Sequence, residues 1–404
     1  MFGFPSRVST DDTLVRAALD RGVERVYPSR EFLESRLRSG ERLTVYLGID
    51  PTGPSLHLGH AIVLRKLRDF QRLGHRVVLL VGDFTATIGD PTGKLSARQS
   101  LTRATVLANA RRYRREAATF LKFFGLNRAR VKHNSAWLQG LTLADVVRLA
   151  AHVTVDQMAK RDMFVERAAS GKPTFLHEFL YPLLQGYDSV AMAVDGEVGG
   201  NDQTFNMLVG RDLEKALIGK DKFVIAMKLL EDTTGKKMGK TEGNMVTLAD
   251  EPKDMFGKVM SWTDGMIARG LELCTDVPAD EIAGIEEMLA RKTVNPRDAK
   301  VRLARAIVAV FHGEREAARA ADNFGAAGDA KEVHVDGISD TYYVVCAREE
   351  IVPSKSELKR LFAQGAVTRA GSGERITDGP DTVITKDIDL RIGKKHFLNI
   401  RLRK

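Results

Sequence analysis

The stretch Thr44-Val-Tyr-Leu-Gly-Ile-Asp-Pro-Thr-Gly-Pro-Ser-Leu-His-Leu-Gly-His60 decides the fold of this chain. Its apolar start, 44–49, predicts a buried strand, and residues 50–54 predict a turn. The apolar spacing that follows predicts a helix over 58–73, and the run 76–81 predicts a second strand covered on both faces. A strand, a helix and a strand at this spacing form a right-handed unit. The sequence therefore predicts an α/β fold with a parallel sheet.

The rest of the chain continues this alternation and then becomes helical. We expect a strand over 130–133, a helix near 143–151, a short strand near Ser189–Val194, a strand-like run at 223–225 and helices over 251–311. The Gly/Ala stretch Gly325–Asp329 indicates a boundary. A length of 404 residues predicts two or three domains.

Composition narrows the class of protein. The chain is 43% hydrophobic and 28% charged, which is ordinary for a globular protein. It lacks the uninterrupted apolar run of about 20 residues that a membrane span requires. The start lacks a secretory layout, and only Cys274 and Cys346 are present. We expect no membrane partner and a cytoplasmic location.

Positive charge is concentrated at the end of the chain. The net charge is +9, and Arg391 to Lys404 contains six basic residues and no acidic one. Basic side chains between apolar ones fit contact with a polyanion such as a nucleic acid. A solvated surface remains the alternative reading of the charge alone.

His57 and His60 lie where the first predicted helix begins. Main-chain N–H groups lack helical partners there, and the helix dipole favours an anion. A pair of packed or surface histidines is the alternative. Gly59 between them favours the functional reading, because a missing side chain lets a flat ring lie against the helix.

A second candidate for phosphate contact lies far downstream. Lys237-Met238-Gly239-Lys240 places two ammonium groups on a short loop between Gly235 and Gly243. Together with the histidines, this loop predicts two separate segments that grip one nucleoside triphosphate.

Two segments resemble known binding motifs but do not match them. The loop Gly89–Lys94 is one residue too short for a P-loop, and Leu95 stands where Ser or Thr is required. Lys94 and Arg98 still have phosphate-binding chemistry. The pair His177-Glu178 is no zinc motif, because Tyr181 occupies the position of the second histidine.

Polar residues recur at helical spacing in Tyr181-Pro-Leu-Leu-Gln-Gly-Tyr-Asp188. Tyr181, Gln185 and Asp188 fall on one face of a helix. Polar groups on an inward face need partners or a ligand, whereas a solvated helix face is the alternative. Downstream, Gly199 to Gln203 predicts a glycine turn with a carboxylate and an amide at a helix start.

In this order, from Thr44 to Asn244, the motifs resemble those of the bacterial tyrosyl-tRNA synthetases, class I enzymes with HIGH and KMSKS signatures. Gly239 replaces the serine of the second signature, and Asn201 stands where serine or threonine is usual. The resemblance implies three parts: a Rossmann-like catalytic domain over 1–235 with a dimerisation insertion at about 130–200, a signature loop with a helical anticodon-binding domain over 236–335, and a small α+β RNA-binding module over 340–404. Segments near 354–367 and 392–397 resemble a module named after a small-subunit ribosomal protein.

The resemblance also implies a role for each matching residue. The tyrosine site would comprise Tyr46, Asp90, Tyr181, Gln185, Asp188 and Gln203, with Tyr46 and Asp188 at the phenolic hydroxyl. The triphosphate would be surrounded by Thr52, His57, Lys94, Arg98, Lys237, Lys240 and Thr241, with His60 near the ribose and adenine. Further nucleotide contacts would come from Asp50, Gly59, Gly200, Asp202 and Met238. RNA contacts would come from Lys355, Lys359, Arg360, Arg369, Lys394 and Lys395.

The implied substrates are L-tyrosine, ATP and tRNA(Tyr), and the family forms homodimers. Mg²⁺ would arrive with ATP, held by phosphates and water rather than by a protein cage. Three rival interpretations remain. Tyr46 and Asp188 argue against a tryptophanyl-tRNA synthetase, because an indole has no hydroxyl. The intact signatures argue against an inactive RNA-binding paralogue, and the loop spacing argues against a P-loop ATPase.

Overall fold

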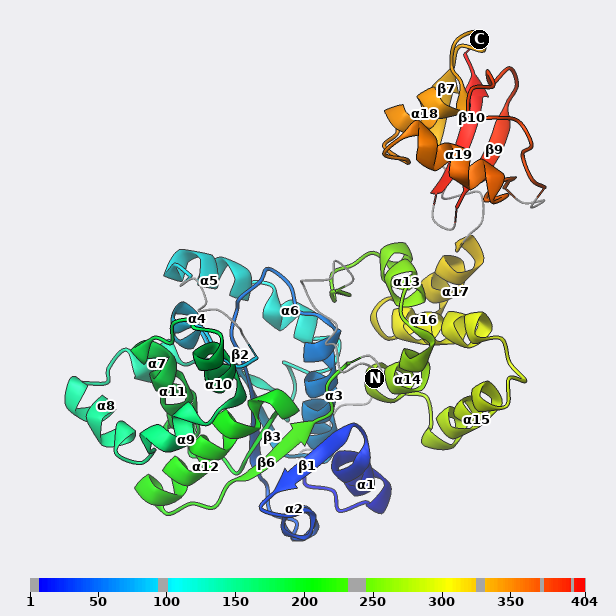
Figure 1. Cartoon of the computed structure of the whole chain (residues 1–404). Helices are drawn as coiled ribbons and strands as arrows, with labels where there is room; N and C mark the ends of the chain where they lie inside the picture. Colours follow the sequence, from blue (N-terminus) through cyan, green and yellow to red (C-terminus); the bar gives the residue numbers. More distant parts are fainter. Residues whose placement is uncertain are drawn as a thin grey trace. The chain divides into compact units, whose positions relative to one another are not determined.

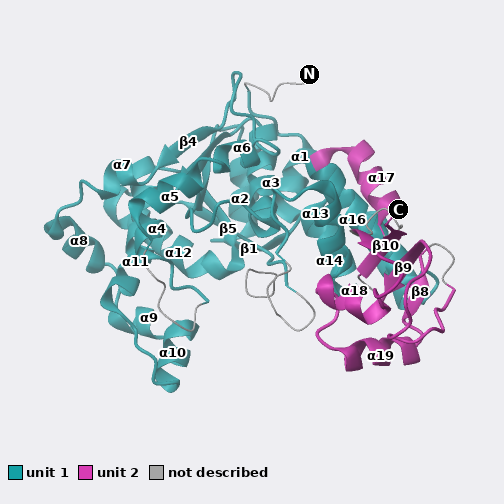
Figure 2. Cartoon of the chain, turned by 90° about the horizontal axis from the view of Figure 1, so that it is seen from above, with its two compact units in different colours: residues 1–311 teal, residues 312–404 magenta. Residues whose placement is uncertain are grey.

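The computed structural model describes residues 7–93, 101–231, 245–324, 331–370, 374–393 and 396–403. It divides into two compact units, residues 1–311 and 312–404, which Figure 2 colours separately. Each unit has its own sheet.

The first unit is built on a six-stranded sheet with the order β1-β6-β5-β2-β3-β4. Figure 1 labels β1, β2, β3 and β6 of this sheet. Its strands are β1 (Val23–Tyr27), β2 (Thr44–Ile49), β3 (Arg76–Val81), β4 (Arg130–His133), β5 (Gly196–Gly200) and β6 (Phe223–Met227). All neighbours run parallel except β1, which pairs antiparallel with β6 at the edge. The predicted α/β class is confirmed, and β2, β3 and β4 have the predicted bounds.

Helices surround this sheet and continue after it. They are α1 (Asp12–Asp20), α2 (Arg30–Arg38), α3 (Leu58–Arg72), α4 (Thr85–Ile88), α5 (Arg103–Ala110), α6 (Tyr113–Ala117), α7 (Ser135–Leu138), α8 (Leu143–Ala150), α9 (Val155–Ala159), α10 (Asp162–Ala169), α11 (Leu176–Met192), α12 (Thr204–Ile218), α13 (Pro252–Met260), α14 (Ile267–Cys274), α15 (Ala279–Ala290) and α16 (Pro296–His312). The predicted helix after β2 is α3, which buries Leu58, Ile62, Leu64, Leu67 and Phe70. None of the described helices combines the length and the apolar character that crossing a membrane requires.

One predicted strand is wrong. Ser189–Val194 lies mostly in α11, which runs without a break to Met192 and ends where Ala193 takes a left-handed conformation. The strand of this region is β5, where three of five residues are glycine. Gly196 is required by packing, because a Cβ there would lie 2.1 Å from the Phe223 ring. The glycine turn predicted at Gly199 and Gly200 is also wrong, because these two residues are the last residues of β5.

The second unit begins with α17 (Glu314–Asn323) and contains a four-stranded sheet with the order β7-β10-β9-β8. Its further elements are β7 (Lys331–Val335), α18 (Tyr342–Arg348), α19 (Lys355–Ala363), β8 (Val367–Arg369), β9 (Ile388–Ile392) and β10 (His396–Leu402). Buried side chains such as Val345, Leu358, Leu390 and Ile400 form its core. This is the expected small α+β arrangement. The predicted boundary Gly325–Asp329 lies outside the described residues.

Candidate active site

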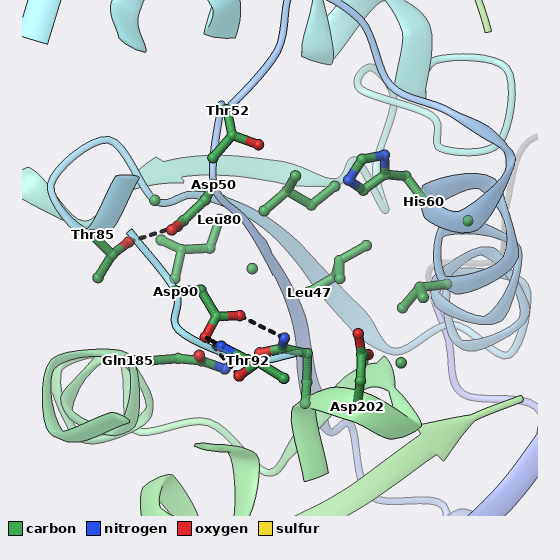
Figure 3. A pocket seen from close by; sticks show the side chains of 18 of the residues that line it. Leu47, Asp50, Thr52, His60, Leu80, Thr85, Asp90, Thr92, Gln185 and Asp202 are labelled. Carbon is green, nitrogen blue, oxygen red and sulfur yellow. Dashed lines mark hydrogen bonds between the residues drawn. The ribbon is translucent and has the colours of Figure 1, made fainter. Parts of the chain in front are cut away.

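A pocket of about 400 Å³ lies at the carboxyl ends of β2, β3 and β5, where parallel sheets commonly bind ligands (Figure 3). The structure brings thirteen of the predicted site residues together in its lining. They are Tyr46, Asp50, Thr52, His57, Gly59, His60, Asp90, Tyr181, Gln185, Asp188, Gly200, Asp202 and Gln203. The predicted residues Lys94, Arg98, Lys237, Met238, Lys240 and Thr241 lie outside the described residues.

The two histidines cap the start of α3. The His57 Nδ1 accepts the main-chain N–H of Gly59, and the His60 Nδ1 accepts the main-chain N–H of His57, both at 3.1 Å. Their ring centroids are 3.9 Å apart. A neutral ring whose Nδ1 accepts a hydrogen bond carries its proton on Nε2. The caps therefore assign both rings as Nε2–H donors.

Local packing explains why residue 59 is a glycine. A Cβ there would lie 2.9 Å from the His57 ring, so the glycine makes room for the capping imidazole. The glycine in the sequence predicts a flat ring against the helix at this point. The ring that lies there is that of His57 itself.

The described residues on either side of segment 232–244 both lie beside the pocket. Before it, Leu229 and Leu230 line the cavity. After it, Thr247 forms an antiparallel bridge with His57, and the Leu58 N–H donates to the Val246 carbonyl at 3.1 Å. The residues that follow the lysine motif are therefore paired with the histidine motif.

Asp50 accepts hydrogen bonds from two other pocket residues. The Thr85 hydroxyl donates to its Oδ1 at 2.7 Å, and the Tyr181 hydroxyl donates to its Oδ2 at 2.9 Å (Figure 3 draws the first). Burial and then the charge of Asp50 raise the pKa of Tyr181 well above its ordinary value. Tyr181 therefore remains a neutral phenol that fixes Asp50 at the end of β2.

Asp90 is oriented by a chain of hydrogen bonds. Thr92 donates its N–H and its hydroxyl to Asp90 Oδ1, and the Gln203 amide donates to Oδ2 at 2.8 Å. Arg161 in turn donates to the Thr92 hydroxyl at 2.9 Å and lies over the Phe205 ring. The carboxylate thus has a defined orientation beside the cavity.

The amides of Gln185 and Gln203 share one partner. Asn206, which is fully buried on α12, donates its side-chain N–H groups to both amide oxygens, at 3.0 and 3.1 Å. This orients both amide nitrogens. The polar face predicted for 181–188 therefore points into the pocket.

The deep end of the pocket carries Tyr46 and Asp188. The Tyr46 hydroxyl is 3.0 Å from the Ser189 hydroxyl, and Tyr46 is fully buried. Asp188 accepts the Trp137 ring N–H at 2.8 Å and the Asn134 amide at 3.2 Å. Burial raises the pKa of Asp188 well above its ordinary value, and these two donors oppose that rise. Both residues present polar groups in a buried environment.

Sequence reasoning missed several residues that support these side chains. They are Thr85, Asn134, Trp137, Arg161, Ser189, Glu197, Asn206 and Lys222. They come from separate elements, so no short motif contains them. The sequence signal that could have revealed them is a polar residue between apolar ones, such as Glu197 in β5, which is buried.

The predicted RNA-contacting residues lie on the second unit. Lys355, Lys359 and Arg360 are exposed on α19. Lys355 pairs with Asp381, and Arg369 pairs with Glu374. Lys394 and Lys395 lie outside the described residues. In the first unit, the arginines of 111–115 are exposed around the buried Tyr113, which fits a solvated face and contact with tRNA alike.

Comparison with known proteins agrees with this geometry. The family model for class I tRNA synthetases (W and Y) matches residues 38–327. The tyrosine–tRNA ligase of Moorella thermoacetica is 42% identical over 95% of this chain and 94% of its own length. That of Thermotoga maritima is 44% identical over 92% and 94%. A C-terminally truncated mitochondrial tyrosyl-tRNA synthetase of Coccidioides posadasii has a similar structure, with a TM-score of 0.62, 27% identity, and coverage of 78% of this chain and 92% of its own.

The family match spans most of the chain, and the relatives are similar along nearly its whole length. On these grounds the chain belongs to the class I tRNA synthetases for tryptophan and tyrosine, among the tyrosine–tRNA ligases.

Proposed function

We propose that this chain activates L-tyrosine with ATP, forming tyrosyl-adenylate and pyrophosphate, and then transfers tyrosine to the 3′-terminal adenosine of tRNA(Tyr). One observation carries the proposal. The polar face of α11, formed by Tyr181, Gln185 and Asp188, lines the same pocket as His57 and His60. The proposed amino-acid site and the proposed phosphate site therefore share one cavity.

At the amino-acid end, Tyr46 and Asp188 bind the phenolic hydroxyl. Asp90, Tyr181 and Gln185 hold the ammonium group, and Gln203 faces the carboxylate. A phenylalanine would leave the Tyr46 and Asp188 side chains without the hydrogen bonds that the substrate hydroxyl makes to them in a buried site, which costs free energy. An indole has no hydroxyl for them either, so tyrosine is favoured over tryptophan.

At the nucleotide end, the substrate carboxylate attacks the α-phosphate of ATP and pyrophosphate leaves. The nucleophile is already ionised, so no general base is required. Catalysis consists of holding two anions together and stabilising charge on the leaving group. We assign the triphosphate contacts to Thr52, His57, Lys94, Arg98, Lys237, Lys240 and Thr241. Their cationic members stabilise the departing pyrophosphate.

The adenosine part is bound by residues on the other side of the cavity. His60, Asp50, Gly59, Gly200, Asp202 and Met238 form this subsite, with Asp202 at the ribose. Gly200 supports the assignment, because a Cβ there would lie 2.6 Å from the Asp202 carboxylate. The pairing of Val246–Leu248 with Leu56–Leu58 supports joint action of the histidine and lysine motifs.

Mg²⁺ accompanies ATP and neutralises phosphate charge. Asp50 and Asp90 already accept two or more hydrogen bonds each, so they do not offer a preformed carboxylate cage. This donor set fits an ion held by phosphate oxygens and water. No metal is assigned to protein ligands.

We also propose that the chain works as a homodimer. Exposed apolar side chains gather on the insertion at about 130–200. They include Leu143 and Leu176, each 80% exposed, and Val147, Val155 and Val165. Exposed apolar surface of this kind is typical of an interface. Light scattering should give the mass of two chains, and Leu176→Glu should give the mass of one.

For tRNA, we assign the helical region within 236–335 to the anticodon and the module 340–404 to further RNA contact. Lys355, Lys359, Arg360, Arg369, Lys394 and Lys395 are the proposed RNA contacts of the module. Since the proposed substrates are those of translation, we place the enzyme in the cytoplasm.

Exchange of labelled pyrophosphate into ATP, run with each of the twenty amino acids and without tRNA, tests the proposal. Exchange with tyrosine alone would support adenylation and its specificity together. Exchange with tryptophan would overturn the tyrosine assignment. A folded protein that binds ATP and gives no exchange would overturn the enzyme assignment and favour an RNA-binding paralogue.

A further inference from the structure

A lysine is completely buried behind the deep end of the pocket. Lys222 lies just before β6 and is 0% exposed. Its ammonium group donates to Glu197 Oε2 at 2.5 Å and to the Ser189 hydroxyl at 2.7 Å. The same nitrogen lies 5.8 Å from the centre of the Tyr46 ring.

The fold provides space for this ammonium group. Helices α11 and α12 cross closely at Gly186 and Gly210, where a Cβ on Gly186 would lie 3.1 Å from the Gly210 nitrogen. A Cβ on Gly210 would lie 2.8 Å from Lys222 Nζ and 3.0 Å from Ser189 Oγ. Two glycines therefore create the notch in which the lysine meets the serine.

The hydrogen-bond chemistry of lysine fixes the direction of this network. An ammonium group only donates, so Ser189 accepts from Lys222. The Ser189 hydroxyl hydrogen can then be donated to the Tyr46 oxygen, 3.0 Å away. With its oxygen accepting from Ser189, Tyr46 has its own hydrogen to donate. The Glu197 carboxylate is a competing acceptor beside it, since burial and then Glu197 raise the pKa of Tyr46.

Without the ammonium group, the competition for the Tyr46 hydrogen would become stronger. Ser189 would no longer be held as an acceptor of Lys222, and Glu197 would have lost its cation. Glu197 lines the same pocket, and Gln185 donates to its other oxygen only at 3.4 Å. A buried hydroxyl donates to whichever acceptor is left unsatisfied nearby. The Tyr46 hydrogen would then turn away from the pocket.

We infer that Lys222 is a positioning residue for tyrosine recognition: by holding Ser189 as an acceptor and neutralising Glu197, it directs the Tyr46 hydroxyl hydrogen toward the phenolic oxygen of the substrate. That oxygen accepts from Tyr46, and the substrate hydroxyl donates to Asp188. The inference rests on the proposed function. It adds a residue that never touches the substrate.

The test compares tyrosine with phenylalanine in pyrophosphate exchange by the full-length protein. Lys222→Met removes the donor with little change in length. We expect kcat/KM for tyrosine to fall about tenfold, as for one lost hydrogen bond, and kcat/KM for phenylalanine to stay unchanged. The KM for ATP should not change.

A second variant guards against misfolding. Lys222→Met leaves Glu197 buried without its cation, whereas Lys222→Met combined with Glu197→Gln removes the charge pair together. The double variant should lose the same discrimination. Lys66→Met is the matched control, since Lys66 is equally buried but donates to the carbonyls of Ala17 and Ala18. It should melt at a lower temperature and keep the wild-type ratio of tyrosine to phenylalanine.

Equal losses for tyrosine and phenylalanine, or an unchanged ratio in the folded double variant, would overturn the inference. So would a ratio that falls as far in Lys66→Met. Failure of the wild-type protein to exchange pyrophosphate with tyrosine would instead refute the proposed function, which keeps the two failures distinct.

Discussion

The substitution Gly82→Ala tests the geometry that fixes Asp50. Gly82 follows β3, and its conformation is one that alanine also adopts, so only space is at issue. A Cβ at this position would lie 2.0 Å from Asp50 Oδ1 and 2.5 Å from the Thr85 hydroxyl. To restore ordinary contact, the Asp50 oxygen must move by about 1.4 Å. That movement breaks the hydrogen bond from Thr85 and weakens the one from Tyr181.

The expected cost has two parts. Overpacking should lower the free energy of unfolding by about 1–3 kcal/mol. Displacing the hydrogen-bonded carboxylate should raise the activation free energy by about 2 kcal/mol, which is roughly thirtyfold in kcat/KM for tyrosine. Thermal melting measures the first part, and tyrosine-dependent pyrophosphate exchange measures the second.

Gly284→Ala is the matched control. Gly284 lies inside α15 with no atom within 4 Å of an added Cβ, and alanine favours a helix more than glycine does. This variant should melt at the same or a slightly higher temperature and keep its exchange rate. Wild-type melting and wild-type kcat/KM in Gly82→Ala would refute the placement of Asp50 against Gly82.

Three further predictions concern buried polar groups. Burial raises the pKa of Glu214 to about 7, so the folded protein loses stability as pH rises from 4.5 to 7. The variant Glu214→Gln should therefore be more stable than wild type by about 2 kcal/mol at pH 8. At pH 4 the two proteins should be equally stable. Urea unfolding at both pH values checks this, and the same difference at both would contradict it. Arg167→Met should lower the free energy of unfolding by about 3–5 kcal/mol, because Glu178 then stays buried without its cation. Adding Glu178→Met should restore most of the lost stability. An unchanged melting curve in the single variant would be the contrary result. Trp137→Phe removes a donor to Asp188, so KM for tyrosine should rise about tenfold while KM for ATP stays constant in exchange kinetics, and parallel rises would count against it.

Much of the fold was predictable because its signals are local. The strands β2 and β3 and the helix between them are apolar runs separated by turn residues, and the structure confirms them. The strand predicted at Ser189–Val194 failed because a short apolar run fits a helix as well as a strand. The glycines of β5 hid the true strand. Gly196 is required by contact with Phe223, which is distant in sequence, whereas Gly199 lies against Met207 and Gly200 against Asp202.

The residues of the candidate site also differ in how far the sequence predicts them. Residues in ordered motifs, such as His57 and Asp188, were found because each motif is continuous in sequence. Their partners were not, since Trp137 and Lys222 lie on separate elements and contact the pocket residues Asp188 and Glu197. A hydrogen bond between elements leaves no periodic trace in either one, so only the folded chain reveals it.

The pairing of β1 with β6 has a consequence for synthesis. Val23 lies opposite Met227, so the first strand cannot join the sheet until about 200 further residues have left the ribosome. At roughly 5–20 residues per second, that interval is on the order of 10–40 s. During it, the nascent chain exposes the edge of an unfinished sheet. Slow translation through the middle of the message would lengthen this exposure, and chaperones would have their longest opportunity to bind there.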